Sequence, residues 1–304
     1  MNDYEHSRQR EARIIELPRK LDERGNLSIA EEFAPLPFRH ARAYWVYDVP
    51  GGELRDGHGY RRNREFIVAL SGSFEVGVID GRGEKSFMLN RSYYGLYVPA
   101  RCWRQLRNFS TNAVALVLAS TPYDESDYVF TAEEFLNRNI YAPEASCTDL
   151  PVANEAATPV SVSSGSTIDR CRIIDYHTYK TRRQGNLSVV ENGSTAPFAI
   201  RRSFWIYDVP GGQSRGGHAH AVQHELVTAA SGSFSVRLTD GSDSRDFFLN
   251  RPSKGLYIPP GVWIDLHDFS AGAICLAFAS DTYCESDNLR DYSSFINRHK
   301  TTVK

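Results

Sequence analysis

Short apolar segments separated by turn residues recur along the chain and predict strands. Residues 42–49 are aromatic and β-branched and stop at a Pro-Gly-Gly sequence, which is typical of a strand that ends in a turn. Residues 74–79 mostly alternate between apolar and other positions, as in a half-buried strand, whereas residues 113–119 are apolar throughout and indicate a buried one. Residues 131–136 begin with the Thr-x-x-Glu sequence of a capping box, which predicts a short helix.

The whole pattern returns once, shifted by a constant number of residues. His58 corresponds to His218, an offset of 218 − 58 = 160. The same offset relates three further pairs, which are Gly72 and Gly232, Trp103 and Trp263, and Phe135 and Phe295. Because the match needs no insertion from Arg24 to Phe135, it indicates the duplication of one domain.

Composition agrees with two domains built from strands. The chain has 304 residues, of which 41% are hydrophobic and 12% aromatic, enough for two domains of ordinary size. We predict an all-β chain with two tandem jelly-roll or β-barrel domains, over residues 1–140 and 169–304. Residues 141–168 are rich in Ala, Ser, Thr and Pro and lack periodicity, which favours a linker.

Charge and apolar content exclude several kinds of partner. The formal net charge of -2 gives no basic excess of the kind that non-specific nucleic-acid binding needs. No apolar run approaches the roughly 20 residues of a membrane helix, and the polar residues 1–13 do not resemble a signal peptide. The five cysteines show no CxxC spacing. We therefore expect a cytoplasmic protein with reduced thiols and with neither nucleic acid nor membrane as a partner.

The candidate chemistry lies in the sequence Arg-Gly-Gly-His-Ala-His, which ends at His220. On a strand, His218 and His220 point to the same face because side chains alternate with a period of two. The first repeat has His58 and then Tyr60 at the matching positions. The chain therefore carries one complete copy of a site and one altered copy.

The second copy resembles the cupin motifs. The first motif matches at Gly212, His218, His220, Glu225 and Gly232, and the second at Gly255, Pro259 and Gly261. Where a metal-binding cupin has its last histidine, this chain has Ile264, and Arg104 in the first repeat. The incomplete ligand set predicts a site without metal. Two other interpretations stay open at this point. The histidines could be remnants of a metal site that has been lost, or they could belong to a working metal site.

Further motifs narrow the resemblance. They are Phe204-Trp205-Ile206-Tyr207-Asp208, the Arg215–His220 sequence, Gly255-Leu256-Tyr257, Trp263, Ala279-Ser280 and Glu285-Ser286-Asp287. Together, over nearly all of each repeat, they resemble the sugar 3,4-ketoisomerases, cupin enzymes that act on dTDP-4-keto-6-deoxyglucose and are related to the WxcM-like proteins. Members of that family are homodimers that exchange N-terminal strands and need no metal. The resemblance implies an intramolecular pseudo-dimer with exchanged strands, monomeric or further dimerised, and no cofactor.

The residues suit the reaction that the resemblance implies. In a dTDP-linked 4-keto-6-deoxy sugar, the C4 ketone acidifies the hydrogen at C3, so a base can form an enediol that is reprotonated at C4. Histidine, with a reference pKa of about 6.5, can both accept and donate a proton near neutral pH. By similarity to the family, His220 is the base at C3 and His218 shuttles or stabilises. A non-catalytic protein that binds a sugar nucleotide or another carbohydrate is the alternative.

Candidate substrate contacts follow from the same resemblance and from the needs of a nucleotide. We expect cations at the diphosphate and an aromatic ring against the base. The candidates are Arg202 and Arg215 for the diphosphate, Trp205, Tyr257 or Trp263 for the base, Asp265 as the acid that follows the tryptophan in the family, and Arg24 as the family's early arginine.

The first repeat lacks several of these groups. Its pocket would collect His58, Tyr60 and Gln105, with Gln184 of the second repeat in place of an arginine. Neutral tyrosine, with a pKa of about 10, is a poor base at pH 7. If the first repeat lends its N-terminal strand to the second, Arg24 joins His218 and His220. We therefore expect one working site in the second repeat and a degenerate site in the first.

Overall fold

The computed structural model describes residues 11–137 and 167–302. The predicted linker, residues 141–168, lies outside the described residues except for its last two positions. Within the two described ranges, no helix is long and apolar enough to span a membrane. Nearly all the regular structure is antiparallel β-sheet, so the prediction of an all-β chain is confirmed.

Each repeat supplies a similar series of strands and ends in a helix. The first repeat contains β1 (Arg13–Glu16), β2 (Arg19–Lys20), β3 (Asn26–Glu32), β4 (Pro35–Leu36), β5 (Arg42–Tyr47), β6 (Arg55–Tyr60), β7 (Glu65–Ser71), β8 (Phe74–Asp80), β9 (Gly83–Leu89), β10 (Tyr94–Val98), β11 (Trp103–Arg107), β12 (Val114–Ala119), β13 (Tyr128–Val129) and α2 (Ala132–Asn137). The second contains β14 (Arg172–Asp175), β15 (His177–Thr181), β16 (Gly185–Glu191), β17 (Arg202–Tyr207), β18 (Arg215–His220), β19 (Glu225–Ser231), β20 (Phe234–Thr239), β21 (Ser244–Leu249), β22 (Lys254–Ile258), β23 (Trp263–His267), β24 (Ile274–Ala279), β25 (Asn288–Leu289) and α3 (Tyr292–Thr302).

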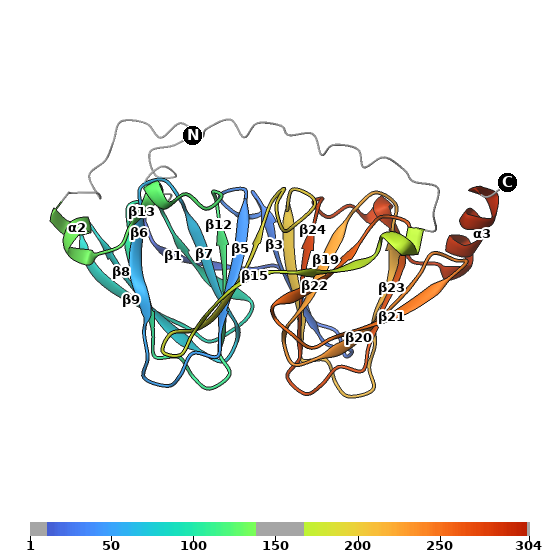
Figure 1. The fold of residues 1–304 in the computed structure, drawn as a ribbon, viewed down its shortest axis with the longest axis horizontal. Helices are drawn as coiled ribbons and strands as arrows, with labels where there is room; N and C mark the ends of the chain where they lie inside the picture. The colour runs from blue at the N-terminus through green and yellow to red at the C-terminus, as the bar shows by residue number, and fades with distance from the viewer. Residues whose placement is uncertain (1–10, 138–166, 303–304) are drawn as a thin grey trace.

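The strands form two barrels that lie side by side (Figure 1). Each barrel combines a large sheet with a five-stranded sheet, the layered arrangement of a cupin jelly roll. In the first barrel the orders are β1-β10-β7-β12-β5-β16-β15 and β13-β6-β11-β8-β9. In the second they are β14-β22-β19-β24-β17-β3-β2 and β21-β20-β23-β18-β25. The predicted architecture of two tandem cupin domains is confirmed.

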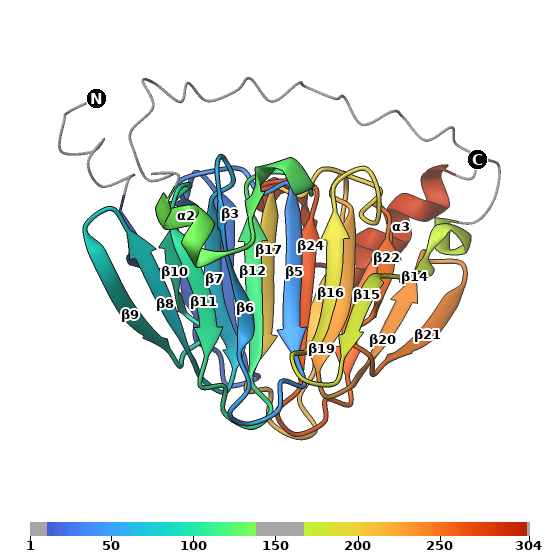
Figure 2. The same cartoon turned by 60° about the vertical axis from the view of Figure 1, so that its left-hand side comes forward.

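Each large sheet contains strands from both repeats, as Figure 2 shows where β16 lies beside β5. Strand β3 of the first repeat pairs antiparallel with β17 of the second, with Ile29 opposite Phe204. Strand β16 of the second repeat pairs in the same way with β5 of the first, with Val189 opposite Tyr44. An N-terminal strand of each repeat therefore completes the large sheet of the other.

The central strands of the large sheets, among them β7, β12, β19 and β24, are buried on both faces. In β19, Leu226 packs into a central core between the repeats, whereas the next residue, Val227, packs into the core of its own barrel. Two tryptophans of the central core each donate a hydrogen bond to the other repeat. Trp45 Nε1 donates to the carbonyl of Pro252 (3.0 Å), and Trp205 Nε1 donates to the carbonyl of Ser92 (2.8 Å). Burial on both faces explains why residues 113–119 are apolar without alternation.

A histidine buried between the repeats makes stability depend on pH. His40 is 1% exposed; its Nε2 lies 3.0 Å from Ser203 Oγ, and its Nδ1 has no hydrogen-bond partner among the described residues. Burial lowers the pKa of His40 to about 4, from a reference value of about 6.5. As the pH falls from 6.5 to 4, His40 becomes protonated in the unfolded chain but stays neutral in the folded chain. The folded state therefore loses up to about 3 kcal/mol over this range.

We expect His40→Ile to remove this loss, since the second repeat has Ile200 at the matching position. Urea unfolding at pH 7.5 and at pH 5 should show a smaller drop in unfolding free energy for the variant than for the wild type. Replacing the exposed His177 with glutamine should leave the drop unchanged. Equal drops in the wild type and His40→Ile would contradict this account.

Candidate active site

The two histidines of the second repeat face the inside of its barrel. In the register of β18 against β23, His218 lies opposite Ile264 and Ala219 opposite Trp263. Ile264 belongs to the barrel core, whereas Ala219 and Trp263 pack with Phe295 of α3 in a separate cluster. Since residues directly opposite each other share a face, His218 points inward, and so does His220 two positions on.

A bulge in β18 sets where this strand places its histidines. The pairing with β23 shifts between Gly216 and His218. Gly216 has a φ of 89°, and a Cβ there would lie 2.4 Å from the carbonyl oxygen of Ile264. Only glycine tolerates both the conformation and the close approach. Gly216 is therefore required by the geometry of the strand at this bulge.

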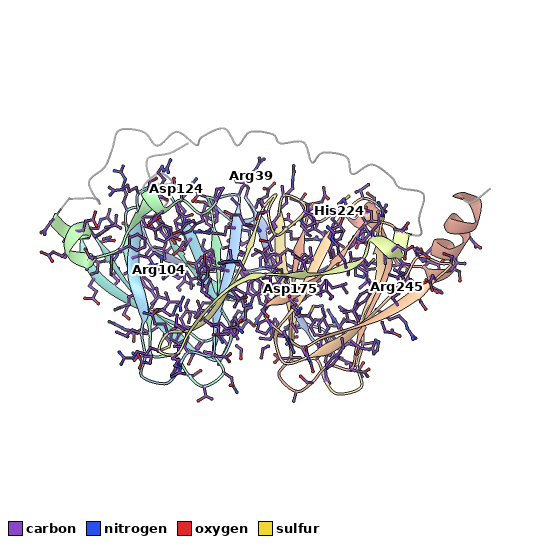
Figure 3. The ribbon with its side chains drawn as sticks, in the orientation of Figure 1. Arg39, Arg104, Asp124, Asp175, His224 and Arg245 are labelled. Carbon is purple, nitrogen blue, oxygen red and sulfur yellow. The ribbon has the colours of Figure 1, made fainter. Side chains whose placement is uncertain are left out.

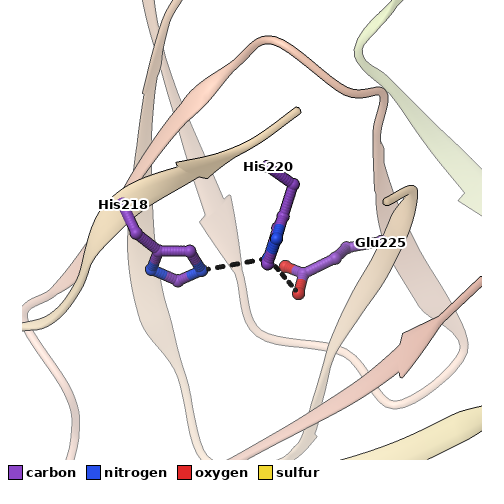
Figure 4. Close-up of side chains that lie close together, drawn as sticks. All are labelled: His218, His220 and Glu225. Carbon is purple, nitrogen blue, oxygen red and sulfur yellow. Dashed lines mark hydrogen bonds and ion pairs between the residues drawn. The ribbon is translucent and has the colours of Figure 1, made fainter. Parts of the chain in front are cut away.

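His220 lies between two carboxylates, one at each ring nitrogen (Figure 4 shows Glu225 and His218). Its Nε2 atom is 3.1 Å from Glu225 Oε1 and 3.2 Å from His218 Nε2. Its Nδ1 atom is 3.2 Å from Asp287 Oδ2, an ion-pair distance without the alignment of a hydrogen bond. Both His220 and Glu225 are 4% exposed, so these charges interact with little screening by water.

This environment separates the pKa values of the two histidines. Burial opposes a positive charge on His220, but the carboxylates of Glu225 and Asp287 outweigh it and raise the pKa of this imidazole above its usual value. Burial lowers the pKa of His218, which Glu225 only partly offsets. Burial also disfavours the Glu225 carboxylate, yet His220 keeps its pKa at about 2. Two imidazoles of different proton affinity thus lie in contact.

The same cluster holds part of a set of metal ligands. His218, His220 and Glu225 offer three ligand atoms within 4.8 Å of one another. The fourth cupin position is Ile264, which is 2% exposed, carries no donor atom and lies on the same face as His218. These residues do not fit the four-ligand metal site of the cupins.

Arg215 and Arg24 meet at one end of the second barrel. Arg215 Nη1 donates to the carbonyl of Gly25 (2.9 Å) and lies 3.6 Å from Asp22 Oδ2. Arg24 is in the same turn, but its exposed guanidinium pairs with Asp22 at 2.9 Å instead of reaching either histidine. The turn of the first repeat therefore contacts the second repeat's arginine. Arg55 Nη1 makes a similar contact to the corresponding turn of the second repeat, at the carbonyl of Gln184 (2.9 Å).

Three predicted substrate contacts face away from the histidines. Trp263 and Asp265 lie on the outer face of β23, where Trp263 Nε1 donates to Asp265 Oδ2 at 3.0 Å. Tyr257 lies in the central core between the repeats, with its hydroxyl 2.7 Å from His224 Nδ1. These three side chains do not share a face with His218, because strand alternation turns them to other faces.

Arg202 is close to the site but buried beneath it, at 5% exposure. Its Nη2 atom donates to Gln223 Oε1 at 2.7 Å, and the amide of Gln223 in turn contacts His220 and Glu225. Sequence reasoning missed Gln223 and a role for Asp287. The signals were present, since Gln223 precedes Glu225 by two residues and Asp287 closes a Glu-Ser-Asp sequence found in both repeats.

The pocket of the first repeat holds a different network. His58 Nε2 lies 3.0 Å from the hydroxyl of Tyr60, whose ring packs 4.6 Å from that of Tyr128. Arg104, shown among the strands of the first barrel in Figure 3, donates from Nε to Glu65 Oε2 at 2.8 Å. Burial raises the pKa of Tyr60 well above its usual value, which leaves this hydroxyl neutral. In the described part of this pocket, Tyr60 therefore stands where the second repeat has the imidazole of His220.

Gln105 does not join this network. It stands opposite Gly77 in β8, between the inward-facing Arg104 and Leu106. Like Asp265 in the second repeat, it belongs to the outer face of its sheet. The predicted degenerate site therefore brings together His58 and Tyr60 but not Gln105.

Comparison with known proteins identifies the family. The sequence matches the family described as "FdtA: WxcM-like, C-terminal" twice, over residues 10–139 and 169–300. A TDP-4-oxo-6-deoxy-alpha-D-glucose-3,4-oxoisomerase from Aneurinibacillus thermoaerophilus is 38% identical over 112 residues, which are 37% of this chain and 81% of that protein.

Solved structures give matches of the same kind. A 3,4-ketoisomerase from Helicobacter canadensis is 34% identical over 43% of this chain and 98% of its own, with a TM-score of 0.42. A sugar 3,4-ketoisomerase from Thermoanaerobacterium thermosaccharolyticum, in complex with TDP, is 32% identical over 44% of this chain and 97% of its own, with a TM-score of 0.43. Because the family match covers most of the sequence in two copies, this chain belongs to the FdtA, WxcM-like family.

Proposed function

We propose that the chain is a sugar-nucleotide 3,4-ketoisomerase that converts a dTDP-4-keto-6-deoxyhexose to the dTDP-3-keto-6-deoxyhexose. The observation that carries the proposal is the contact of His218 with His220, which is flanked by Glu225 and Asp287. The relative from Aneurinibacillus supports the substrate class, since its name describes this isomerisation. The work of the site is proton transfer next to a ketone, which histidine can perform at neutral pH.

The reaction follows from these groups. His220 removes the proton from C3, and the electrons of the broken C–H bond form a C3–C4 double bond as the C4 carbonyl becomes an enediol oxygen. Glu225 and Asp287 stabilise the imidazolium that results. His218 accepts the O3 proton and passes it to the C4 oxygen, C3 becomes the ketone, and His220 delivers its proton to C4. Each proton that is removed is thus returned to another atom of the sugar, so atoms and charge balance over the cycle.

The substrate's diphosphate is proposed to bind at the end of the barrel where Arg215 lies. This guanidinium is partly exposed and already contacts the turn around Gly25 of the first repeat. Arg24, exposed in that turn, adds a second cation. In this proposal the two repeats act as a pseudo-dimer within one chain, and the first repeat completes the site of the second.

A deuterium experiment tests the function. When TDP-4-keto-6-deoxyglucose is incubated with the protein in deuterium oxide, NMR should show a 3-keto product with deuterium at C4 and recovered substrate with deuterium at C3. A protein that only binds the sugar nucleotide would leave both positions unlabelled. Absence of label with bound substrate would therefore overturn the proposal in favour of a binding protein.

A further inference from the structure

A buried amide connects the catalytic histidine to a buried arginine. Gln223 lies between β18 and β19 and is 3% exposed. Its Nε2 atom is 2.9 Å from His220 Nε2 and 2.9 Å from Glu225 Oε1, and its Oε1 accepts from Arg202 Nη2 at 2.7 Å. All four side chains are nine-tenths or more buried, so each contact is made without competition from water.

Arg202 determines which way the amide points. A guanidinium has only donors, so Arg202 requires the oxygen of the Gln223 amide. The NH₂ group of Gln223 is then turned toward His220 and Glu225, and this group also has only donors. A donor at 2.9 Å from His220 Nε2 favours a lone pair on that nitrogen. The neutral ring therefore carries its proton on Nδ1, on the side of Asp287.

Besides His218, the His220 Nε2 atom has two neighbours, Gln223 and Glu225, and these serve two protonation states. Before proton transfer, the amide of Gln223 donates to the lone pair. After Nε2 has accepted a proton, this N–H can donate to Glu225 Oε1, 3.1 Å away. The amide keeps its second contact, to Glu225, in both states. Gln223 thus holds the ring ready to accept, and Glu225 receives the N–H that results.

The first repeat shows that this network is not a requirement of the fold. Asn63 stands at the matching position and is one methylene shorter. Its Oδ1 instead accepts hydrogen bonds from the backbone and the hydroxyl of Thr121 (3.2 and 3.1 Å) and from Ser120. Tyr60 replaces His220 there, and Asn63 Nδ2 has no hydrogen-bond partner among the described residues. The longer amide therefore accompanies the second histidine.

We propose that Gln223, oriented by Arg202, is a positioning residue that keeps Nε2 of His220 unprotonated before the reaction. The proposal rests on the proposed function for its effect on turnover, but not for its effect on the tautomer of His220. It also gives Arg202 a role beneath the site in place of the predicted contact with the diphosphate.

The test replaces Gln223 with methionine, which has a similar length and no donor. We expect kcat to fall by about 10²-fold, as for a misplaced reacting group, while KM changes less than threefold. The ¹⁵N shifts of the His220 ring at pH 8.5, assigned by their loss in His220→Asn, should show the proton on Nδ1 in the wild type. In Gln223→Met they should show it on Nε2, where it can be donated to Glu225.

Asn63→Leu is the matched control in the first repeat and should change neither kcat nor the tautomer. Unchanged kcat in Gln223→Met, or the same His220 tautomer in wild type and variant, would overturn the proposal. The tautomer can be measured on protein without substrate. If the wild type does not catalyse exchange at all, the proposed function fails while the positioning of His220 is still decided by the spectrum.

Discussion

Replacing His220 with asparagine is expected to lower kcat by about 10³-fold, within the range that general acid–base catalysis supplies. Asparagine fills a similar space but cannot accept the C3 proton near neutral pH. The first repeat is untouched by this change, and its Tyr60 is neutral and buried. The measurement is turnover of TDP-4-keto-6-deoxyglucose followed by NMR.

The control is His58→Asn, the matching change in the first repeat. It breaks the contact between His58 Nε2 and the hydroxyl of Tyr60 and should leave kcat within twofold of the wild type. Residual turnover in His220→Asn above about a tenth of the wild-type rate would show that the first repeat also catalyses, and the single-site account would be wrong.

Replacing Arg104 with isoleucine, the residue at position 264 of the second repeat, is expected to cost about 3–5 kcal/mol of stability. Arg104 is 4% exposed and pairs with Glu65, which is 1% exposed, through two of its nitrogens at 2.8 and 3.1 Å. Without the guanidinium, Glu65 keeps only the hydrogen bond from Tyr44 and becomes a buried, unpaired charge. Urea unfolding at pH 7 measures the loss.

The stabilisation by the Arg104–Glu65 pair depends on pH. Burial disfavours the Glu65 carboxylate, but Arg104 holds its pKa at about 2. The pair therefore stabilises the fold above the unfolded pKa of about 4.3, and this stability is lost as pH falls toward 2. The deficit of Arg104→Ile should shrink below pH 4, and adding Glu65→Gln should restore part of it at pH 7. A deficit under about 1 kcal/mol at pH 7 would contradict the account.

Much of the fold could be predicted because its causes are local. The repeat at a fixed offset implied two copies of one domain, and the apolar run over residues 113–119 marked a central strand, now β12. The predicted helix at residues 131–136 matches α2 within one residue. The strands with which β3 and β16 pair could not be predicted from the local sequence. Either repeat offers them the same β-sheet edge, so alternation alone cannot say which sheet they complete.

The site was predicted in part for the same reason. A period of two is enough to place His218 and His220 on one face. The same period puts Asp265 on the other face of β23 from its neighbour Ile264, which points into the barrel. Asp265 was a candidate only because of the resemblance to the family, not because of this period. Gln223 and Asp287 contact His220 only because the turn after β18 and the segment before β25 meet at its ring. Such a meeting depends on tertiary packing that one sequence does not display.

The central claim is that one site, in the second repeat, does the chemistry and that the first repeat completes it. The most direct measurement is a crystal structure of His220→Asn with TDP-4-keto-6-deoxyglucose. We expect the sugar ring against His218 and Asn at position 220, with the diphosphate near Arg215 and the turn around Gly25. A sugar nucleotide bound only in the first barrel, beside His58 and Tyr60, would contradict the account.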